Sequence, residues 1–338
     1  MADTFSWHIA NASGQLFHHV DMGCQEKRLV EKVCDIYDKI LKLENLIPST
    51  HVDTLFTQLV LTCIAPSPID VSKLSKRVQE IRSNLIKLCG EAEGLLESHF
   101  STIIGSNENP FNHLNIFPYY SNYLKLSQLE FTMLSNHFTG LPNQIAFIGS
   151  GPLPLTSIML ASYHLRTTFF HNYDIDSLAN SKALRLVSSH PDLSKRMFFH
   201  TADIMNVTNN LKEYEVVFLA ALVGMSKEQK AQVIDHLGKH MAPGALLVLR
   251  SANGARAFLY PVIDPCDLQE FEVLSVYHPT DEIINSVIIA RKYPMPIDLL
   301  NPRNGSIILP GKCSEIQHFN PLNHGSEIEE FAIDEKLS

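Results

Sequence analysis

The chain has 338 residues, of which 45 % are hydrophobic and 9 % are aromatic, a composition typical of a folded globular protein. At about 150 residues per domain, this length allows one large domain or two. The formal net charge is -9 at pH 7. The chain therefore lacks the basic excess that neutralises phosphates, and we expect no nucleic-acid partner.

The N-terminal segment shows no pattern typical of a leader. The first basic residue is Lys27, whereas a secretory leader needs a basic start and a transit peptide needs arginines. The longest apolar run, around residues 216–223, is too short to cross a bilayer. We therefore expect a cytoplasmic protein without stable membrane insertion. Residues 1–21 have no clear period and are predicted to be an unstructured extension.

Residues 22–142 are predicted to form an all-helical domain. Apolar residues recur there at spacings of three and four, and no strand-like alternation occurs before residue 143. Pro48 ends the first helix, Asp53 is the expected cap of the second, and Asp70 is expected to start the third. The apolar stripes fall at residues 29–43, 55–64, 71–103 and 124–138.

Residues 143–293 alternate between short apolar runs and helical patterns. Strands are predicted at 144–148, 168–173, 197–200, 215–221, 245–249, 273–277 and 286–291, and helices at 156–165, 178–187 and 227–240. Such apolar strands suit a doubly wound parallel sheet. The last two strands have no full helix between them, which favours an antiparallel edge pair. The predicted fold is α/β, a methyltransferase-type Rossmann sheet of about seven mostly parallel strands behind the helical domain. Residues 294–338 are predicted to be an irregular tail.

A glycine turn, Gly149-Ser150-Gly151, follows the first predicted strand and opens a helix. A dinucleotide fingerprint needs a third glycine at position 154 and free amides for the pyrophosphate, but Pro152 and Pro154 have no amide hydrogen. The turn therefore favours a ligand without phosphate, such as S-adenosylmethionine (SAM), over a dinucleotide.

Two aspartates at predicted strand ends suit the rest of such a ligand. Asp174 ends the second strand, where a carboxylate can accept hydrogen bonds from ribose hydroxyls. Asp203 follows the third strand, where folds of this kind contact the adenine amino group. Each aspartate could equally be an ordinary helix cap or turn residue.

Four longer motifs make the chain recognisable. They are Thr-Leu-Phe-Thr-Gln-Leu-Val at 54–60, Asn-Ile-Phe-Pro-Tyr-Tyr at 115–120, Phe-Ile-Gly-Ser-Gly-Pro-Leu-Pro-Leu-Thr at 147–156 and Asn-Tyr-Asp-Ile-Asp at 172–176. With them the chain resembles plant nicotianamine synthases from about residue 22 to about residue 325. The resemblance implies condensation of three SAM molecules into nicotianamine, with release of three methylthioadenosines and closure of an azetidine ring. The product chelates iron, copper, zinc and nickel, so the implied role is metal homeostasis, iron transport and supply of a phytosiderophore precursor.

This chemistry needs a group that takes a proton from the attacking ammonium, and a carboxylate suits that task. Glu97, in an apolar stretch, is the candidate base. Family members with a base in the helical domain place a tyrosine 26 residues later, which here is Tyr123. Glu93 and Glu130 are alternative bases, and a solvated helix face is the alternative for Glu97 itself.

The remaining expectations concern ligands and competing functions. Arg250 or Arg256 could clamp a substrate carboxylate. The sixteen histidines show no metal-ligand spacing, so we expect no metal site and no cofactor beyond the substrate SAM. A homodimer is left open. A SAM-dependent methyltransferase is the alternative function, and a SAM-binding sensor without turnover is a third.

Overall fold

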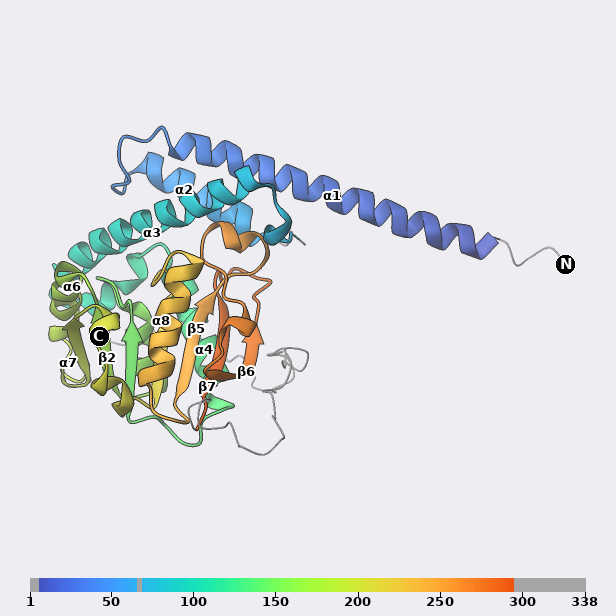
Figure 1. Ribbon diagram of the computed structural model, residues 1–338. Helices are drawn as coiled ribbons and strands as arrows, with labels where there is room; N and C mark the ends of the chain where they lie inside the picture. Colours follow the sequence, from blue (N-terminus) through green and yellow to red (C-terminus); the bar gives the residue numbers. More distant parts are fainter. Residues whose placement is uncertain (1–5, 66–68, 295–338) are drawn as a thin grey trace, which may run out of the picture.

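The computed structural model describes residues 6–65 and 69–294, with side chains from residue 23 onward. The tail predicted for 294–338 lies outside the described residues except for its first position. Figure 1 shows the helices α2 (Thr50–Ile64) and α3 (Lys76–Gly105) lying across the ends of the strands of a twisted sheet, whereas α1 (Ser6–Ile40) runs along them and then extends away from the sheet. None of the helices within the described ranges is long and apolar enough to cross a membrane.

The N-terminal part consists of the helices α1 (Ser6–Ile40), α2 (Thr50–Ile64), α3 (Lys76–Gly105) and α4 (Tyr120–Ser135), with short 3-10 helices at Val71–Lys73 and Pro110–Ile116. Helix α1 begins at Ser6, whereas the pattern predicts no regular structure before residue 22. The first proline of the chain is Pro48, so nothing before it forbids a continuous helix.

Two predicted helix starts are wrong. Ser49, not Asp53, caps α2, since its side chain accepts a hydrogen bond from the amide of Val52 at 3.3 Å. Asp70 caps only the short 3-10 helix, and α3 starts after its own cap, Ser75. In both cases a serine stands three residues before a helical amide that its hydroxyl can reach.

The C-terminal part is a seven-stranded sheet in the order β3-β2-β1-β4-β5-β7-β6. Its strands are β1 (Gln144–Ile148), β2 (Phe169–Asp174), β3 (Met197–Thr201), β4 (Val216–Leu219), β5 (Leu246–Ser251), β6 (Phe271–Tyr277) and β7 (Ser286–Lys292). Neighbouring strands from β3 to β5 are parallel, and β7 pairs antiparallel with both β5 and β6. The predicted sheet, including its antiparallel edge pair, is confirmed.

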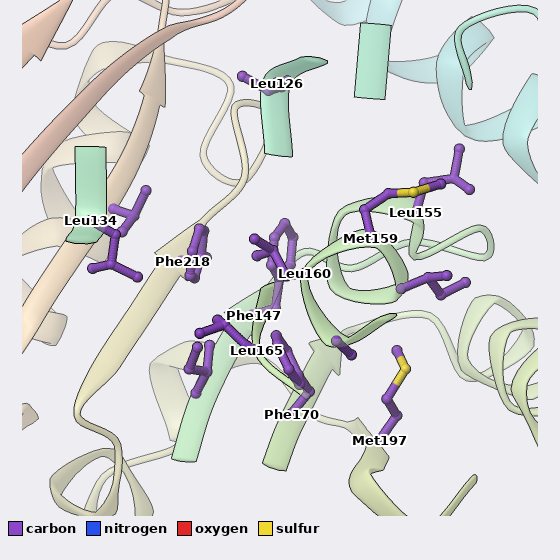
Figure 2. Packing of buried hydrophobic residues seen from close by; sticks show 14 of the residues in the cluster. Leu126, Leu134, Phe147, Leu155, Met159, Leu160, Leu165, Phe170, Met197 and Phe218 are labelled. Carbon is purple, nitrogen blue, oxygen red and sulfur yellow. The ribbon is translucent and has the colours of Figure 1, made fainter. Parts of the chain in front are cut away.

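Helices cover both faces of the sheet. The first face packs against α4, α5 (Leu155–Met159) and α6 (Ser177–Ser188), and the second against α8 (Lys227–His240). Figure 2 shows the first layer, in which Phe147 of β1 stacks on Phe218 of β4 with ring centroids 5.6 Å apart. Strand residues alternate between the two faces of the sheet, and the residues that point to each face are apolar, as the sequence pattern predicted.

The sequence did not signal two features of the sheet layers. Helix α5 passes into a π-helical turn, Leu160–His164, where one continuous helix is predicted, and the short helix α7 (Leu193–Arg196) precedes β3. Further 3-10 helices lie at Ile204–Asn206, Asn209–Glu213, Gly254–Phe258 and Pro265–Asp267.

A separate hydrophobic cluster joins the helical part to the sheet part. It contains residues of α1, α2 and α3 together with Ala255, Phe258, Leu259 and Ile284. Because those last residues follow β5 and precede β7, the helices dock where the parallel strands end. Ligands of open α/β sheets bind at that edge.

Candidate active site

A cavity of about 680 Å³ lies between the helical part and the carboxyl ends of β1, β2 and β4. Residues of α2, α3 and α4 form one side, and the glycine turn, Asp174 and residues 220–223 form the other. This volume is in the range of small-molecule sites. The strand order reverses between β1 and β4, so the cavity occupies the usual ligand position of such sheets.

The glycine turn after β1 uses its amides within the protein. Gly149 and Ser150 both donate to the carbonyl oxygen of Tyr173, at 2.8 Å and 3.2 Å. Gly151 donates to Oδ2 of Asp174 at 2.9 Å. Because these amides are occupied and Pro152 has no amide hydrogen, the turn has few donors left to bind a phosphate. This agrees with the exclusion of a dinucleotide.

Both glycines of the turn have backbone conformations that L side chains rarely adopt, with φ of 78° at Gly149 and 65° at Gly151. A Cβ at Gly149 would collide with the side chain of Val223, and one at Gly151 would stand 2.6 Å from Oε2 of Glu97. The turn is therefore close to the predicted base, which the sequence places 54 residues earlier on α3.

Asp174 and Asp203 occupy different positions. Asp174 lines the cavity, and its other oxygen accepts from the amide of Asp176 at 2.9 Å. Asp203 is exposed and caps a 3-10 helix by accepting from the amide of Met205 at 2.9 Å. It is not among the residues that line the cavity, so its contact with adenine stays a prediction.

The two predicted catalytic side chains meet inside the cavity. The Tyr123 hydroxyl on α4 donates to Oε1 of Glu97 on α3 at 2.9 Å. Glu97 is 8 % exposed, and burial, together with the nearby Glu93, raises its pKa well above the ordinary carboxyl range. The alternative of a solvated helix face for Glu97 is wrong, because this turn of α3 faces the cavity.

A second carboxylate stands beside them. Glu93, one turn earlier on α3, accepts from the Tyr260 hydroxyl at 2.9 Å, and its other oxygen lies 3.4 Å from the Tyr123 hydroxyl. Burial raises its pKa, and the hydrogen bond from Tyr260 lowers it less. Sequence reasoning missed Tyr260, which lies 167 residues from Glu93 in a segment without a recognisable motif.

The two candidate arginine clamps are engaged with the protein. Arg250 on β5 forms a bidentate ion pair with the fully buried Glu130, with distances of 2.7 Å and 2.9 Å, and also donates to Thr156. Glu130 is therefore bound as a counter-ion. Arg256 donates to the carbonyl oxygen of Asp281 and does not line the cavity, whereas Arg250 does.

Within residues 6–65 and 69–294, no group of three or more His, Cys, Asp or Glu side chains is arranged to hold a metal ion.

Comparison with known proteins decides the family. Residues 23–297 match the family described as nicotianamine synthase protein. The chain is 64 % identical over 309 residues to the nicotianamine synthase of Solanum lycopersicum, which covers 91 % of this chain and 98 % of that protein. It is 61 % identical over 322 residues to nicotianamine synthase 3 of Arabidopsis thaliana, covering 94 % and 100 %. The chain belongs to the nicotianamine synthase family. The resemblance read from the motifs is thus confirmed, and with it the class of SAM-dependent transferase.

Solved structures confirm the fold. Crystal structures of MtNAS superpose with TM-scores of 0.65 to 0.66 at 20 % identity, covering 78 % of this chain and 98 % of that one. One of these structures is of a glutamate-to-glutamine mutant in complex with S-adenosylmethionine, and another is of MtNAS in complex with MTA and tNA. The nicotianamine synthase fold, a helical part ahead of a Rossmann-like sheet, is therefore shared over most of the chain.

Proposed function

We propose that this chain makes nicotianamine from three SAM molecules within the cavity, with Glu97 as the proton acceptor and Tyr123 as its hydrogen-bonding partner. One observation carries the assignment. The buried Glu97 carboxylate is held at 2.9 Å by Tyr123 and lies directly against the glycine turn at Gly151. A base at that position lies beside the ligand that the turn and Asp174 would hold.

The reaction balances with one proton per new bond. An amine nitrogen attacks the methylene carbon next to the sulfonium, the C–S bond breaks, and its electron pair returns to sulfur in methylthioadenosine. The attacking nitrogen enters as an ammonium, so it must lose a proton before it can attack. Two intermolecular attacks and one ring closure therefore release three protons for each nicotianamine.

The environment of Glu97 suits this step. Burial raises the pKa of Glu97 above the ordinary carboxyl value, which makes its carboxylate a stronger base than a solvated one. When it has lost its proton, the carboxylate also attracts the sulfonium and ammonium charges of SAM across a poorly solvated site. General-base assistance is typically worth about 10²- to 10⁴-fold in rate.

Selection of the methylene over the methyl carbon must come from positioning, because a misplacement of about 1 Å can reduce the rate about 10²-fold. In this proposal Gly149, Gly151 and Asp174 hold the adenosine part, Asp203 contacts the adenine, and the helical domain of residues 22–142 orients the methionine chain. Arg250 is held in its ion pair with Glu130 and does not itself bind a substrate carboxylate.

The test is to incubate the purified protein with SAM alone and to quantify products by mass spectrometry. Nicotianamine and methylthioadenosine should form in a ratio of about one to three, as the bond count requires. Glu97→Gln should lose product formation but keep SAM binding. Glu80→Gln, on an exposed position of the same helix, is the matched control. S-adenosylhomocysteine formed only with an added acceptor would instead support a methyltransferase, and binding without product a sensor.

The remaining expectations stay predictions with their own tests. The enzyme should keep full activity after exhaustive treatment with a chelator, because the proposed chemistry uses only carboxyl and phenol groups. Fractionation should place the protein in the cytoplasm, and sedimentation should decide between a monomer and the homodimer left open by the sequence.

A further inference from the structure

The cavity contains two carboxylates that share one phenol. Tyr123 lies 2.9 Å from Oε1 of Glu97 and 3.4 Å from Oε1 of Glu93. A phenol has one proton to donate, so it can serve only one carboxylate at a time. Both glutamates lie on α3 one turn apart and point at the same hydroxyl, which makes Tyr123 a bridge between them.

The two carboxylates differ in their access to solvent. Glu97 is 8 % exposed, whereas Glu93 is only half-buried and its second oxygen accepts from Tyr260. Burial raises the pKa of both groups, so neither loses a proton as readily as a solvated carboxyl group. The ionisable groups around Glu93 are Cys89 and Glu97 on α3, Tyr119 and Tyr123 at the start of α4, Arg250 on β5 and Tyr260.

The proposed function makes this arrangement consequential. Each nicotianamine releases three protons, but Glu97 can hold only one and is nearly closed to water. Before the next amine can attack, Glu97 must pass its proton on. Among the cavity groups named above, Glu93 is the carboxylate that a single hydroxyl connects to Glu97.

We propose that Glu93 is a proton-relay residue, which receives the proton from Glu97 through the Tyr123 hydroxyl and so restores Glu97 between condensations. Glu97 gives its proton to the phenol oxygen while the phenol gives its own to Glu93. The phenol ends neutral, Glu97 ends as a carboxylate and Glu93 ends protonated. No oxidant or reductant is needed, and Glu93, the more exposed of the two carboxyl groups, then releases the proton. This inference rests on Glu97 being the base.

The test compares the wild-type protein with Glu93→Gln in rapid-quench reactions with excess SAM, counting methylthioadenosine and nicotianamine per enzyme. The variant keeps the size and hydrogen-bonding oxygen of the side chain but cannot accept the proton. We expect its first methylthioadenosine to appear at a rate within about threefold of wild type, while nicotianamine forms at least about tenfold more slowly. The product ratio should then rise above three to one as partly condensed chains accumulate.

Two further readouts separate a relay from a structural role. Raising the pH should restore the later steps of Glu93→Gln, since hydroxide replaces the missing acceptor, and Glu93→Asp should recover part of the rate. Glu80→Gln is the control. If Glu93→Gln failed to fold, Tyr260→Phe would replace it. That variant keeps the carboxylate but removes the hydrogen bond from Tyr260 that lowers the pKa of Glu93. The midpoint of the pH dependence of the later steps should therefore shift to higher pH.

The outcomes also separate this inference from the proposed function. Nicotianamine made by Glu93→Gln at the wild-type rate would overturn the relay and leave Glu97 as the base. Equal slowing of the first and last steps, unchanged by pH, would overturn it in favour of a structural role. Full activity of Glu97→Gln would refute the base assignment itself.

Discussion

Replacing Gly151 by alanine tests whether the close approach of the glycine turn places the base. A Cβ there would lie 2.6 Å from Oε2 of Glu97, whereas ordinary contact begins at 3.4 Å. The carboxylate must therefore retreat by about 0.8 Å, and a shift of that size can reduce the rate about 10²-fold. Because Glu97 is buried and hydrogen-bonded to Tyr123, the retreat also strains or breaks that bond.

The same substitution has a backbone effect that must be subtracted. Gly151 has φ of 65°, and a side chain in this left-handed region costs roughly 1–2 kcal/mol of folding free energy. Gly140→Ala is the matched control, since Gly140 has φ of 84° with no atom within 4 Å of its Cβ position. Gly140→Ala should show this backbone cost alone in urea unfolding, and any extra loss of stability in Gly151→Ala reports the strain at Glu97.

The assay is the initial rate of methylthioadenosine formation from SAM, together with SAM affinity by calorimetry. Gly151→Ala should lower kcat about 10²-fold while the dissociation constant for SAM changes by less than about fivefold, because the amide that donates to Asp174 remains. Gly140→Ala should keep wild-type kcat. If Gly151→Ala is no slower than Gly140→Ala, the close approach does not position Glu97 and the reasoning fails.

Four further predictions concern the cavity and its supports. Tyr123→Phe removes the hydrogen bond to Glu97 and should lower kcat about 10- to 100-fold, the effect of a bond of about 1.5–3 kcal/mol to a charged group; an unchanged rate would contradict it. The acid limb of kcat/KM should lie above the ordinary carboxyl pKa of about 4.3, since the pKa of Glu97 is raised. Activity should fall as pH drops through that raised value, and an acid limb at the ordinary carboxyl pKa would contradict the assignment. Arg250→Met leaves the buried Glu130 unpaired and should destabilise the fold by about 3–5 kcal/mol in urea unfolding, most of it recovered by adding Glu130→Leu; a loss below about 1 kcal/mol would contradict this. Burial lowers the pKa of Lys230 to about 7, so the unfolded chain binds this proton more tightly than the folded one. The free energy of unfolding should therefore rise with pH from about 7 towards 10. Lys230→Met should reduce this pH dependence in melting experiments.

The sequence by itself determined much of the local architecture. The run of strands and helices after residue 143 follows from apolar patterns and turn residues a few positions apart, and the structure places β1 and α8 at the predicted residues. The glycine turn, with prolines where amides would be needed, excluded a pyrophosphate before any contact was known. These inferences succeed because secondary structure and turn chemistry depend on neighbouring residues.

Only the tertiary structure decided how the cavity groups are paired. The bond from Tyr260 to Glu93 joins residues 167 apart, and the ion pair of Arg250 with Glu130 joins residues 120 apart. No local pattern distinguishes an arginine that binds substrate from one that neutralises a buried glutamate. Such pairs form only when the helices dock on the sheet, because burial and distance then decide which charges are satisfied within the protein and which remain for the ligand.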